Sequence, residues 1–389
     1  MQALSWIQLK GDKGIWIIIF LLSLISLLAV YSSSNILNVR FGENSTEFYF
    51  LKHSILLGVG LVSMYFIHRM DYRIFAKLSN ILMAVSLVLL AYTLFQPVEN
   101  EVNQASRWVR IFGQSFQPSD LAKFSIVIFV AKWLAMQQSV IKDFRKGFLP
   151  ILVFVLAICG FIAPANLSTA LLIFSACFAL MFVSGVQSKY LLSLVLIGII
   201  GLFLLFKFSS RKETWEKRAK EYYLRVTNPE ATPHYQTIQS NIAIAGGGII
   251  GRGAGKSVQR NFLPHPYSDF IYAIIIEEYG LLGGLFVLGL YLFLLIRTVA
   301  VVTVSRTFGA LLAMGLAFMI VFQALVNMGV TVGILPVTGL PLPLISMGGT
   351  SVIFTCMSLG IILSVSRTAI EQKKIQEREA DPEARFGMA

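Results

Sequence analysis

Long runs of apolar residues, separated by short polar segments, follow one another along almost the whole chain. The runs are apolar on every side, which favours helices over the alternating strands of a membrane barrel. Because a helical span needs about 20 mostly apolar residues, the pattern predicts about ten of them. The expected spans cover residues 15–33, 50–68, 76–96, 119–136, 148–164, 167–185, 190–207, 270–297, 308–330 and 346–366.

Domain organisation follows from these spans. We expect an all-α integral membrane protein with a single polytopic transmembrane domain over residues 1–366 and a polar tail over residues 367–389. A large loop over residues 208–269 separates the seventh and eighth spans. The tail is of mixed charge, which predicts a disordered segment or a short exposed helix.

Composition agrees with the membrane interpretation. Of the 389 residues, 56% are hydrophobic and only 13% are charged, which excludes an ordinary water-soluble domain. The net charge of +12 fits basic residues at helix ends that face anionic lipid. Nucleic-acid binding is not expected, because no separate basic module with interleaved aromatic residues is present. The three cysteines form neither a CxxC motif nor a disulfide framework.

Short basic loops set the orientation, because Lys and Arg are enriched on the cytoplasmic side of a membrane. They place both termini in the cytoplasm, which requires an even number of spans. The loop over residues 208–269 then lies outside, and it is itself basic. A solvated loop without a ligand and a loop that binds an anionic ligand are both compatible with that composition.

Asp269 directly precedes the eighth predicted span. In one interpretation Ser268 or Asp269 caps the helix by accepting hydrogen bonds from its first amides. In the other, Asp269 is a carboxylate at the outer membrane face that takes a proton from a substrate hydroxyl.

Glu277 and Glu278 lie about two turns deeper in the same span. Carboxylates in hydrocarbon are costly, so we expect them to face the bundle interior and to pair with a cation or share a proton. Lys123, within the fourth predicted span, is a suitable partner. A structural ion pair and a functional site predict the same residues.

A glycine-rich stretch occupies residues 246–257. It is not a nucleotide-binding loop, because no strand precedes it and Ile250 stands where a Walker A motif has its first glycine. Its backbone, together with Arg252 and Lys256, is a candidate nest for a phosphate. Gly280 and Gly284 form a GxxxG pattern that is typical of helix packing.

Two further segments have unusual chemistry. Between the third and fourth spans, Arg107, Arg110 and Lys123 are candidates to neutralise a phosphate; the alternative is an interfacial Trp108 anchor followed by a Pro/Ser/Asp helix start. Residues 327–351 contain several prolines yet stay apolar. Irregular backbone at membrane depth is tolerated where it is buried in protein or lines a cavity, so a re-entrant segment is expected.

Several motifs occur in a fixed order between residues 106 and 351: SRWVR with QPSDLAK, PANLSTA, YQTIQSNIAIAGGG, FLPHPYSDFIYAIIIEEYG and NMGVTVGILPVTGLPLPLISMGGTS. Together they resemble the SEDS (shape, elongation, division, sporulation) family. The segments GAGKSVQ and SMGGTS look more like its FtsW branch than its RodA branch. The chain departs from the family pattern at Tyr267-Ser268, where His-Thr is usual, and at Ala165-Asn166, where Pro-Asp is usual.

The resemblance implies a peptidoglycan glycosyltransferase that polymerises lipid II, the undecaprenyl-pyrophosphate-linked disaccharide peptide, at the outer face of the inner (cytoplasmic) membrane during cell division. It implies Asp269 as the catalytic residue, with a possible divalent cation (Mg or Mn) but no certain cofactor. It also implies Arg107, Trp108, Asp120 and Lys123 as substrate-binding residues, to which we add Gln239, Ser240, Arg252 and Lys256 as candidates. Implied partners are a class B penicillin-binding protein transpeptidase and other divisome membrane proteins.

Three other functions are compatible with the sequence. Buried Glu277 and Glu278, with the broken segment near Pro341, suit a transporter, including a flippase for the same lipid-linked precursor. An elongation polymerase of the RodA type has the same motifs. A non-catalytic scaffold for a penicillin-binding protein is the third.

Overall fold

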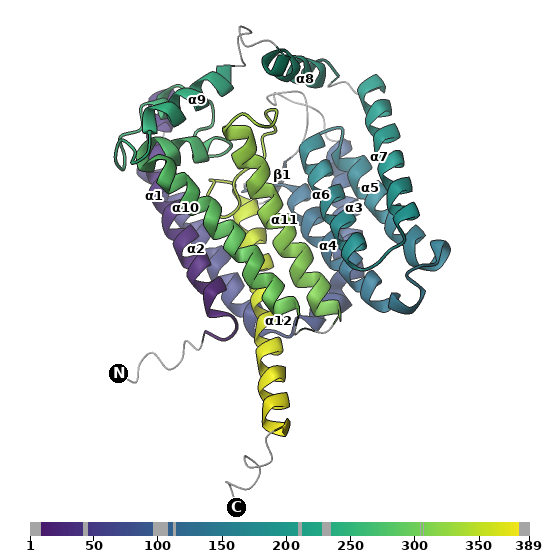
Figure 1. Ribbon diagram of the computed structural model, residues 1–389. Helices are drawn as coiled ribbons and strands as arrows, with labels where there is room; N and C mark the ends of the chain where they lie inside the picture. The colour runs from purple at the N-terminus through teal and green to yellow at the C-terminus, as the bar shows by residue number, and fades with distance from the viewer. Residues whose placement is uncertain are drawn as a thin grey trace, which may run out of the picture.

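The computed structural model describes residues 9–41, 46–95, 108–111, 114–208, 212–227, 235–303, 305 and 307–380. In these residues, long helices run side by side and two shorter helices, α8 and α9, cover one end of them (Figure 1). The long helices are α1 (Lys13–Phe41), α2 (Thr46–Arg69), α3 (Arg73–Leu94), α4 (Pro118–Met136), α5 (Leu149–Ile162), α6 (Leu167–Val183), α7 (Ser188–Phe208), α10 (Ile271–Val302), α11 (Thr307–Thr331) and α12 (Thr350–Ala380).

Each long helix overlaps one predicted span. Within the described residues, eight segments are long and apolar enough to cross a membrane. The other two helices are α6, which has 17 residues, and α4, which contains Asp120, Lys123 and Lys132. The predicted all-α membrane fold is confirmed, while the number of ten spans stays a prediction.

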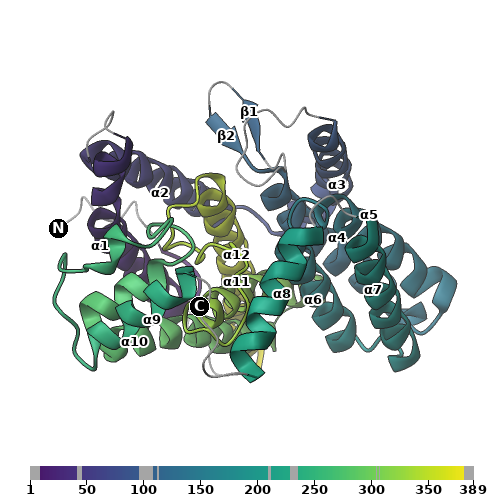
Figure 2. The same cartoon turned by 90° about the horizontal axis from the view of Figure 1, so that it is seen from above.

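The helices form two groups joined through α11. Seen from above, α1, α2, α10 and α12 lie on one side and α3 to α7 on the other (Figure 2). Helices α4 and α6 both pack on α11, and α2 packs on α12. The first turn of α1 and the last turn of α12 lie at the end of the bundle opposite α8 and α9 (Figure 1).

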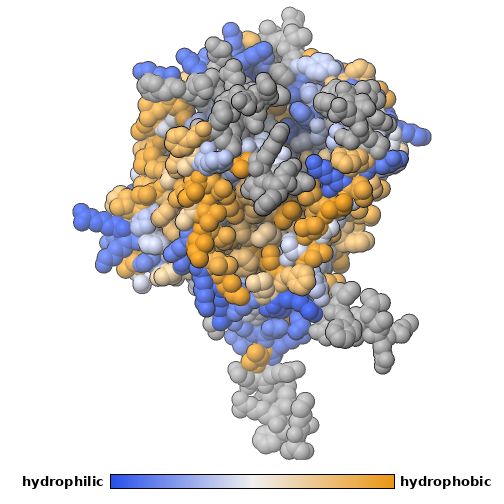
Figure 3. Space-filling view, turned by 180° about the vertical axis from the view of Figure 1, so that it is seen from behind, coloured by the Kyte–Doolittle hydropathy of each residue, from blue (hydrophilic) through white to orange (hydrophobic). Residues whose placement is uncertain are grey.

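The burial of apolar side chains matches that of a protein whose outer surface meets lipid. Side chains in the middle of the bundle, such as Ile126 and Val130 of α4, are fully buried. Those on its outside, such as Ile199 and Phe203 of α7, are more than half exposed. On the face shown in Figure 3, hydrophobic side chains cover the middle of the molecule and hydrophilic ones gather towards its ends. So large an apolar surface is stable only in contact with lipid or another protein.

The loop predicted over residues 208–269 is largely structured. It contains α8 (Lys212–Thr227), α9 (Tyr235–Gly247) and the short 3₁₀ helix η3 (Gln259–Asn261). Helix α8 is tied to the segment between α11 and α12, because Arg218 and Tyr222 donate hydrogen bonds to the carbonyls of Val337 and Ile334 at 3.0 and 2.7 Å. Neither α8 nor α9 was predicted, because neither is long and apolar enough to resemble a span.

Smaller elements complete the fold. A two-stranded antiparallel hairpin, β1 (Val109–Ile111) and β2 (Gln114–Phe116), precedes α4. A 3₁₀ helix, η1 (Gln138–Val140), and a π-helix, η2 (Phe144–Phe148), connect α4 to α5.

Helix α12 does not stop at residue 366 but continues to Ala380, so the first part of the predicted tail is helical, which is one of the two forms expected for it. The residues after 366 are good helix formers, such as Glu, Lys and Gln, which extend an existing helix without a nucleation cost. Arg367 fixes the helix at this level by donating to the carbonyls of Arg69 and Met70 at 2.7 and 3.3 Å.

Helix α10 is broken at Gly280, where φ is 71° and ψ is −175°. The backbone of the glycine-rich segment is hydrogen-bonded to α10 at this break. The amides of Arg252 and Gly253 donate to the carbonyls of Glu277 and Glu278 at 3.0 and 2.9 Å. In return, two amides that follow the break, those of residues 281 and 282, donate to the carbonyls of residues 248 and 249.

Two interpretations of these glycines are therefore wrong. The amides of Arg252 and Gly253 are already bound to carbonyls, so they are not a free phosphate nest. Gly280 and Gly284 do not form a packing face for another helix. Gly280 allows the break, and Gly284 packs against Tyr272 of the same helix, whose hydroxyl donates to the Gly284 carbonyl at 3.1 Å.

Candidate functional site

The segment between α11 and α12 enters the bundle without regular helix, as the sequence predicts. Its prolines have no amide hydrogen to donate, and Leu340, Leu342, Leu344 and Ile345 are nonetheless buried. The hydroxyl of Tyr291, within α10, donates to the Pro343 carbonyl. We call residues 332–349 the re-entrant segment.

The re-entrant segment and α11 hold the backbone around Asp269. Three consecutive carbonyls, those of Tyr267, Ser268 and Asp269, accept hydrogen bonds from Met347 N (2.9 Å), Ser346 Oγ (2.6 Å) and Asn327 Nδ2 (2.8 Å). Donors from two other parts of the chain therefore fix the position from which the Asp269 side chain projects.

The Asp269 carboxylate is half-buried and accepts a hydrogen bond from Ser268 Oγ at 3.0 Å. The N-cap position of α10 belongs to Phe270, which makes no side-chain cap bond, so Asp269 does not take the N-cap position. Burial lowers the pKa of the nearby Arg218 guanidinium, while Asp269 and Glu221 raise it. Arg218 therefore interacts electrostatically with Asp269.

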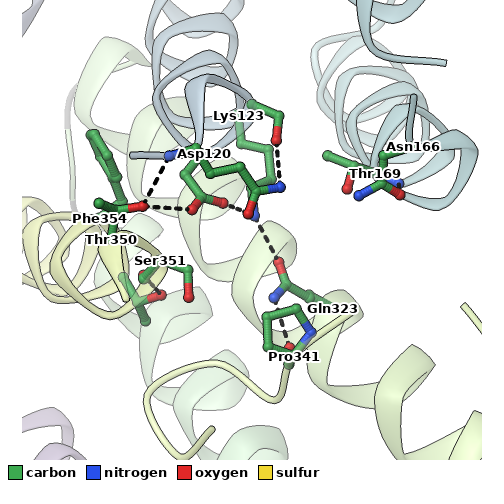
Figure 4. Close-up of polar contacts among 12 residues, drawn as sticks. Asp120, Lys123, Asn166, Thr169, Gln323, Pro341, Thr350, Ser351 and Phe354 are labelled. Atoms are coloured by element: carbon green, nitrogen blue, oxygen red, sulfur yellow. Dashed lines mark hydrogen bonds and ion pairs between the residues drawn. The ribbon is translucent and has the colours of Figure 1, made fainter. Parts of the chain in front are cut away.

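A second charged cluster lies at the start of α4 (Figure 4). Lys123 Nζ is 2.9 Å from Asp120 Oδ1 and donates to Gln323 Oε1 at 3.3 Å. Thr350, the first residue of α12, donates to Asp120 Oδ2 at 3.3 Å. Gln323 in turn donates to the Pro341 carbonyl at 2.8 Å, so this cluster contacts the same re-entrant segment as Asp269. A small pocket opens beside Asp120, Lys123 and Gln323.

Glu277 and Glu278 are buried as predicted, but the expected pairing with Lys123 is wrong. Glu277 lies 3.5 Å from Arg252 and accepts from Ser257 Oγ and from the amides of residues 258 and 259. Glu278 accepts from the hydroxyl of Ser32 and from the Ser257 amide. The carboxylates therefore bind residues 252–259 to the break in α10.

The other predicted substrate-binding residues are dispersed. Arg107 lies outside the described residues, and Trp108 is 38% exposed in front of β1. Ser240 is fully buried and donates to the Thr331 carbonyl at 2.7 Å, while Gln239 is half-buried on α9. Arg252 also donates to the Gly246 carbonyl, and Lys256 is exposed.

Sequence reasoning missed several residues of the two clusters. Gln323 and Asn327 are buried amides four residues apart in a span, and amides are unusual enough there to have indicated a polar site. Ser346 and Arg218 had no such signal. Asn166 accepts a hydrogen bond from the Thr169 amide at 3.3 Å and caps α6 (Figure 4).

An apolar groove of about 800 Å³ lies between α5, α6 and α7. Three glycines, Gly160, Gly198 and Gly201, contribute to its lining, together with Phe174. In the part of the chain that the structure describes, no three His, Cys, Asp or Glu side chains come together as metal ligands.

Comparison with solved structures identifies the class of fold. The chain is similar to one in the structure described as "Structural coordination of polymerization and crosslinking by a peptidoglycan synthase complex", with a TM-score of 0.71, 29% identity, and coverage of 93% of this chain and 99% of that one. It is also similar to the rod shape determining protein RodA of Thermus thermophilus, with a TM-score of 0.67, 26% identity, and coverage of 94% and 99%.

Sequence relatives extend this likeness. Stage V sporulation protein E of Bacillus subtilis is 34% identical over 364 residues, which cover 92% of this chain and 97% of that protein. The probable peptidoglycan glycosyltransferase FtsW of Geobacter metallireducens is 32% identical over 361 residues, with coverage of 92% and 95%. A family model described as "Cell cycle protein" matches residues 12–371. The chain belongs to this family of FtsW, RodA and SpoVE proteins, which confirms the predicted SEDS resemblance and its FtsW-like character.

Proposed function

We propose that this protein is a peptidoglycan glycosyltransferase of the FtsW type, which polymerises lipid II at the outer face of the inner membrane. The observation that supports this most directly is the Asp269 carboxylate. It projects from a backbone segment, residues 267–269, whose three carbonyls are fixed by hydrogen bonds, and it interacts electrostatically with Arg218. The names of the FtsW relatives support the reaction class.

The chemistry needs one base and positive charge. Asp269 accepts the proton of the acceptor sugar's hydroxyl as that oxygen forms a bond to the anomeric carbon of the donor, the sugar that carries the lipid pyrophosphate. The bond between this carbon and the pyrophosphate oxygen breaks, and the electron pair leaves with the lipid pyrophosphate. We assign the stabilisation of the developing negative charge to Lys123 and Arg218, with Arg107 as a further candidate. The proton on Asp269 is then released to water.

If a divalent cation takes part, Asp269 would hold it, and the cation would supply positive charge to the pyrophosphate. No step of the mechanism is assigned to it.

The groove between α5, α6 and α7 suits the substrate's polyprenyl chain, because it is apolar and faces the surrounding lipid. Gly160→Trp would fill it, since nothing lies within 4 Å of a Cβ placed at Gly160. We expect the KM for long-chain lipid II to rise about tenfold, because a groove blocked by an indole loses apolar contact area, while the KM for a short-chain analogue changes little. Steady-state polymerisation with both substrates measures this. Equal changes for the two substrates would contradict the assignment of the groove.

The proposal also includes location and partners. Both ends of the described chain lie on one side of the bundle, which agrees with two cytoplasmic termini. A class B penicillin-binding protein is the proposed partner, because one structural relative belongs to a complex for polymerisation and crosslinking. The FtsW-like sequence favours a role in division, among other divisome membrane proteins, over elongation of the RodA type.

Incubation of the purified protein with lipid II tests the proposal, with and without the partner transpeptidase. We expect glycan strands that a muramidase degrades. No polymer under either condition would exclude the enzyme. Translocation of lipid II across vesicles without polymer would favour the flippase. Polymer that forms only through the partner's own activity would favour the scaffold.

A further inference from the structure

Helix α11 presents two buried amide side chains, Gln323 and Asn327, one turn apart on the same face. They are 5% and 1% exposed. Burying an amide in an apolar bundle costs free energy unless its hydrogen bonds are made. The hydrogen-bond partners of Gln323 and Asn327 therefore indicate the role of these two side chains.

Both amides bind the re-entrant segment at consecutive residues. Asn327 Nδ2 donates to the Leu340 carbonyl at 2.7 Å, and Gln323 Nε2 donates to the Pro341 carbonyl at 2.8 Å. The two carbonyls are neighbours on an irregular backbone, where no helix or strand would otherwise satisfy them.

Each amide also makes a second hydrogen bond, which is not needed to satisfy the carbonyls of residues 340 and 341. Asn327 Nδ2 also donates to the Asp269 carbonyl at 2.8 Å. Gln323 Oε1 accepts from Lys123 Nζ at 3.3 Å. The Lys123 ammonium and the Asp269 backbone are thus connected through α11 and residues 340 and 341, although they belong to α4 and to the start of α10.

We infer that Gln323 is a positioning residue, which holds the Lys123 ammonium in a fixed relation to Asp269 through its bridge to Pro341. This inference rests on the proposed function, because it assigns Lys123 to the pyrophosphate. Without the Gln323 oxygen, Asp120, which lies 2.9 Å from Nζ, would be the remaining described polar partner of Lys123, and the ammonium would lose its second fixed contact. The ammonium would then bind the leaving group less well.

A double-mutant cycle tests this inference. Gln323→Met keeps the length of the side chain but removes both hydrogen bonds. We expect it to lower kcat/KM for lipid II about tenfold, and Lys123→Ala to lower it about a hundredfold. The double variant should equal Lys123→Ala, because a residue that acts through Lys123 has nothing left to position. Thr331→Val is the control, since the Thr331 hydroxyl donates only to the Asn327 carbonyl of its own helix.

Other outcomes would contradict the role of Gln323 or the proposed function. If the effects of Gln323→Met and Lys123→Ala multiply, or if Thr331→Val loses as much activity as Gln323→Met, then Gln323 is structural and the inference is wrong. If Gln323→Met does not fold, the same cycle is run with Gln323→Asn, which keeps the amide but is too short to reach both partners. If the wild-type protein makes no polymer, the proposed function itself fails.

Discussion

Replacing Asp269 with asparagine is expected to lower kcat for lipid II polymerisation by about a thousandfold, the scale of a lost general base. Asparagine has the same shape, and its side-chain oxygen can still accept the hydrogen bond from Ser268 Oγ. The backbone bond from Asn327 to the Asp269 carbonyl does not depend on the side chain. We therefore expect the thermal unfolding midpoint to stay near that of the wild type, so that the loss is chemical rather than structural.

Initial rates of glycan formation by purified protein measure this effect. Glu216→Gln is a matched control, because it neutralises an exposed carboxylate on the same side of the bundle, where the ion pair with Lys212 is solvated and contributes little. Rates within tenfold of the wild type for Asp269→Asn would remove Asp269 from the role of base. Unchanged lipid II translocation by the same variant, with no polymer from the wild type, would support a flippase.

Gly280→Ala is expected to destabilise the fold by about 3 kcal/mol, through a strained backbone and a steric clash together. Residues other than glycine rarely adopt a φ of 71° with a ψ of −175°. A Cβ at this position would also lie 2.1 Å from the Ile249 carbonyl oxygen. The glycine-rich segment would have to move away from α10 and give up its backbone hydrogen bonds.

Thermal unfolding in detergent measures the change, with Gly289→Ala as the control in the same helix. Nothing lies within 4 Å of a Cβ at Gly289, and alanine is a better helix former by about 1 kcal/mol. We expect that variant to unfold at the wild-type temperature or slightly above it. Equal shifts in the unfolding temperature of the two variants would mean that no close backbone contact depends on glycine at the break in α10.

The sequence predicted the features that depend on composition. Apolar runs locate the long helices, prolines within an apolar stretch locate the re-entrant segment, and Asp269 stands out because it directly precedes a span. These signals work because a membrane penalises polar backbone and charge wherever they occur.

What the sequence did not predict depends on which way side chains face. Lys123 pairs with Asp120, three residues earlier on the same helix face, and not with Glu277. Arg252 reaches Glu277 only because glycines let two backbones approach each other. Nothing in the sequence shows that Asn327 and Ser346 bind the carbonyls around Asp269, since these contacts arise only when three distant segments are packed together.

The continuity of α12 has a mechanical consequence. A helix of 31 residues is about 46 Å long, and its first residue, Thr350, binds Asp120 beside Lys123. Arg367 ties the helix to the turn between α2 and α3 and can act as a fulcrum. The arms on either side of it are about 26 and 20 Å long. If the helix stays rigid, force applied sideways to the far end would tilt Thr350 the opposite way, and by a slightly larger distance, because the arm that carries Thr350 is the longer one.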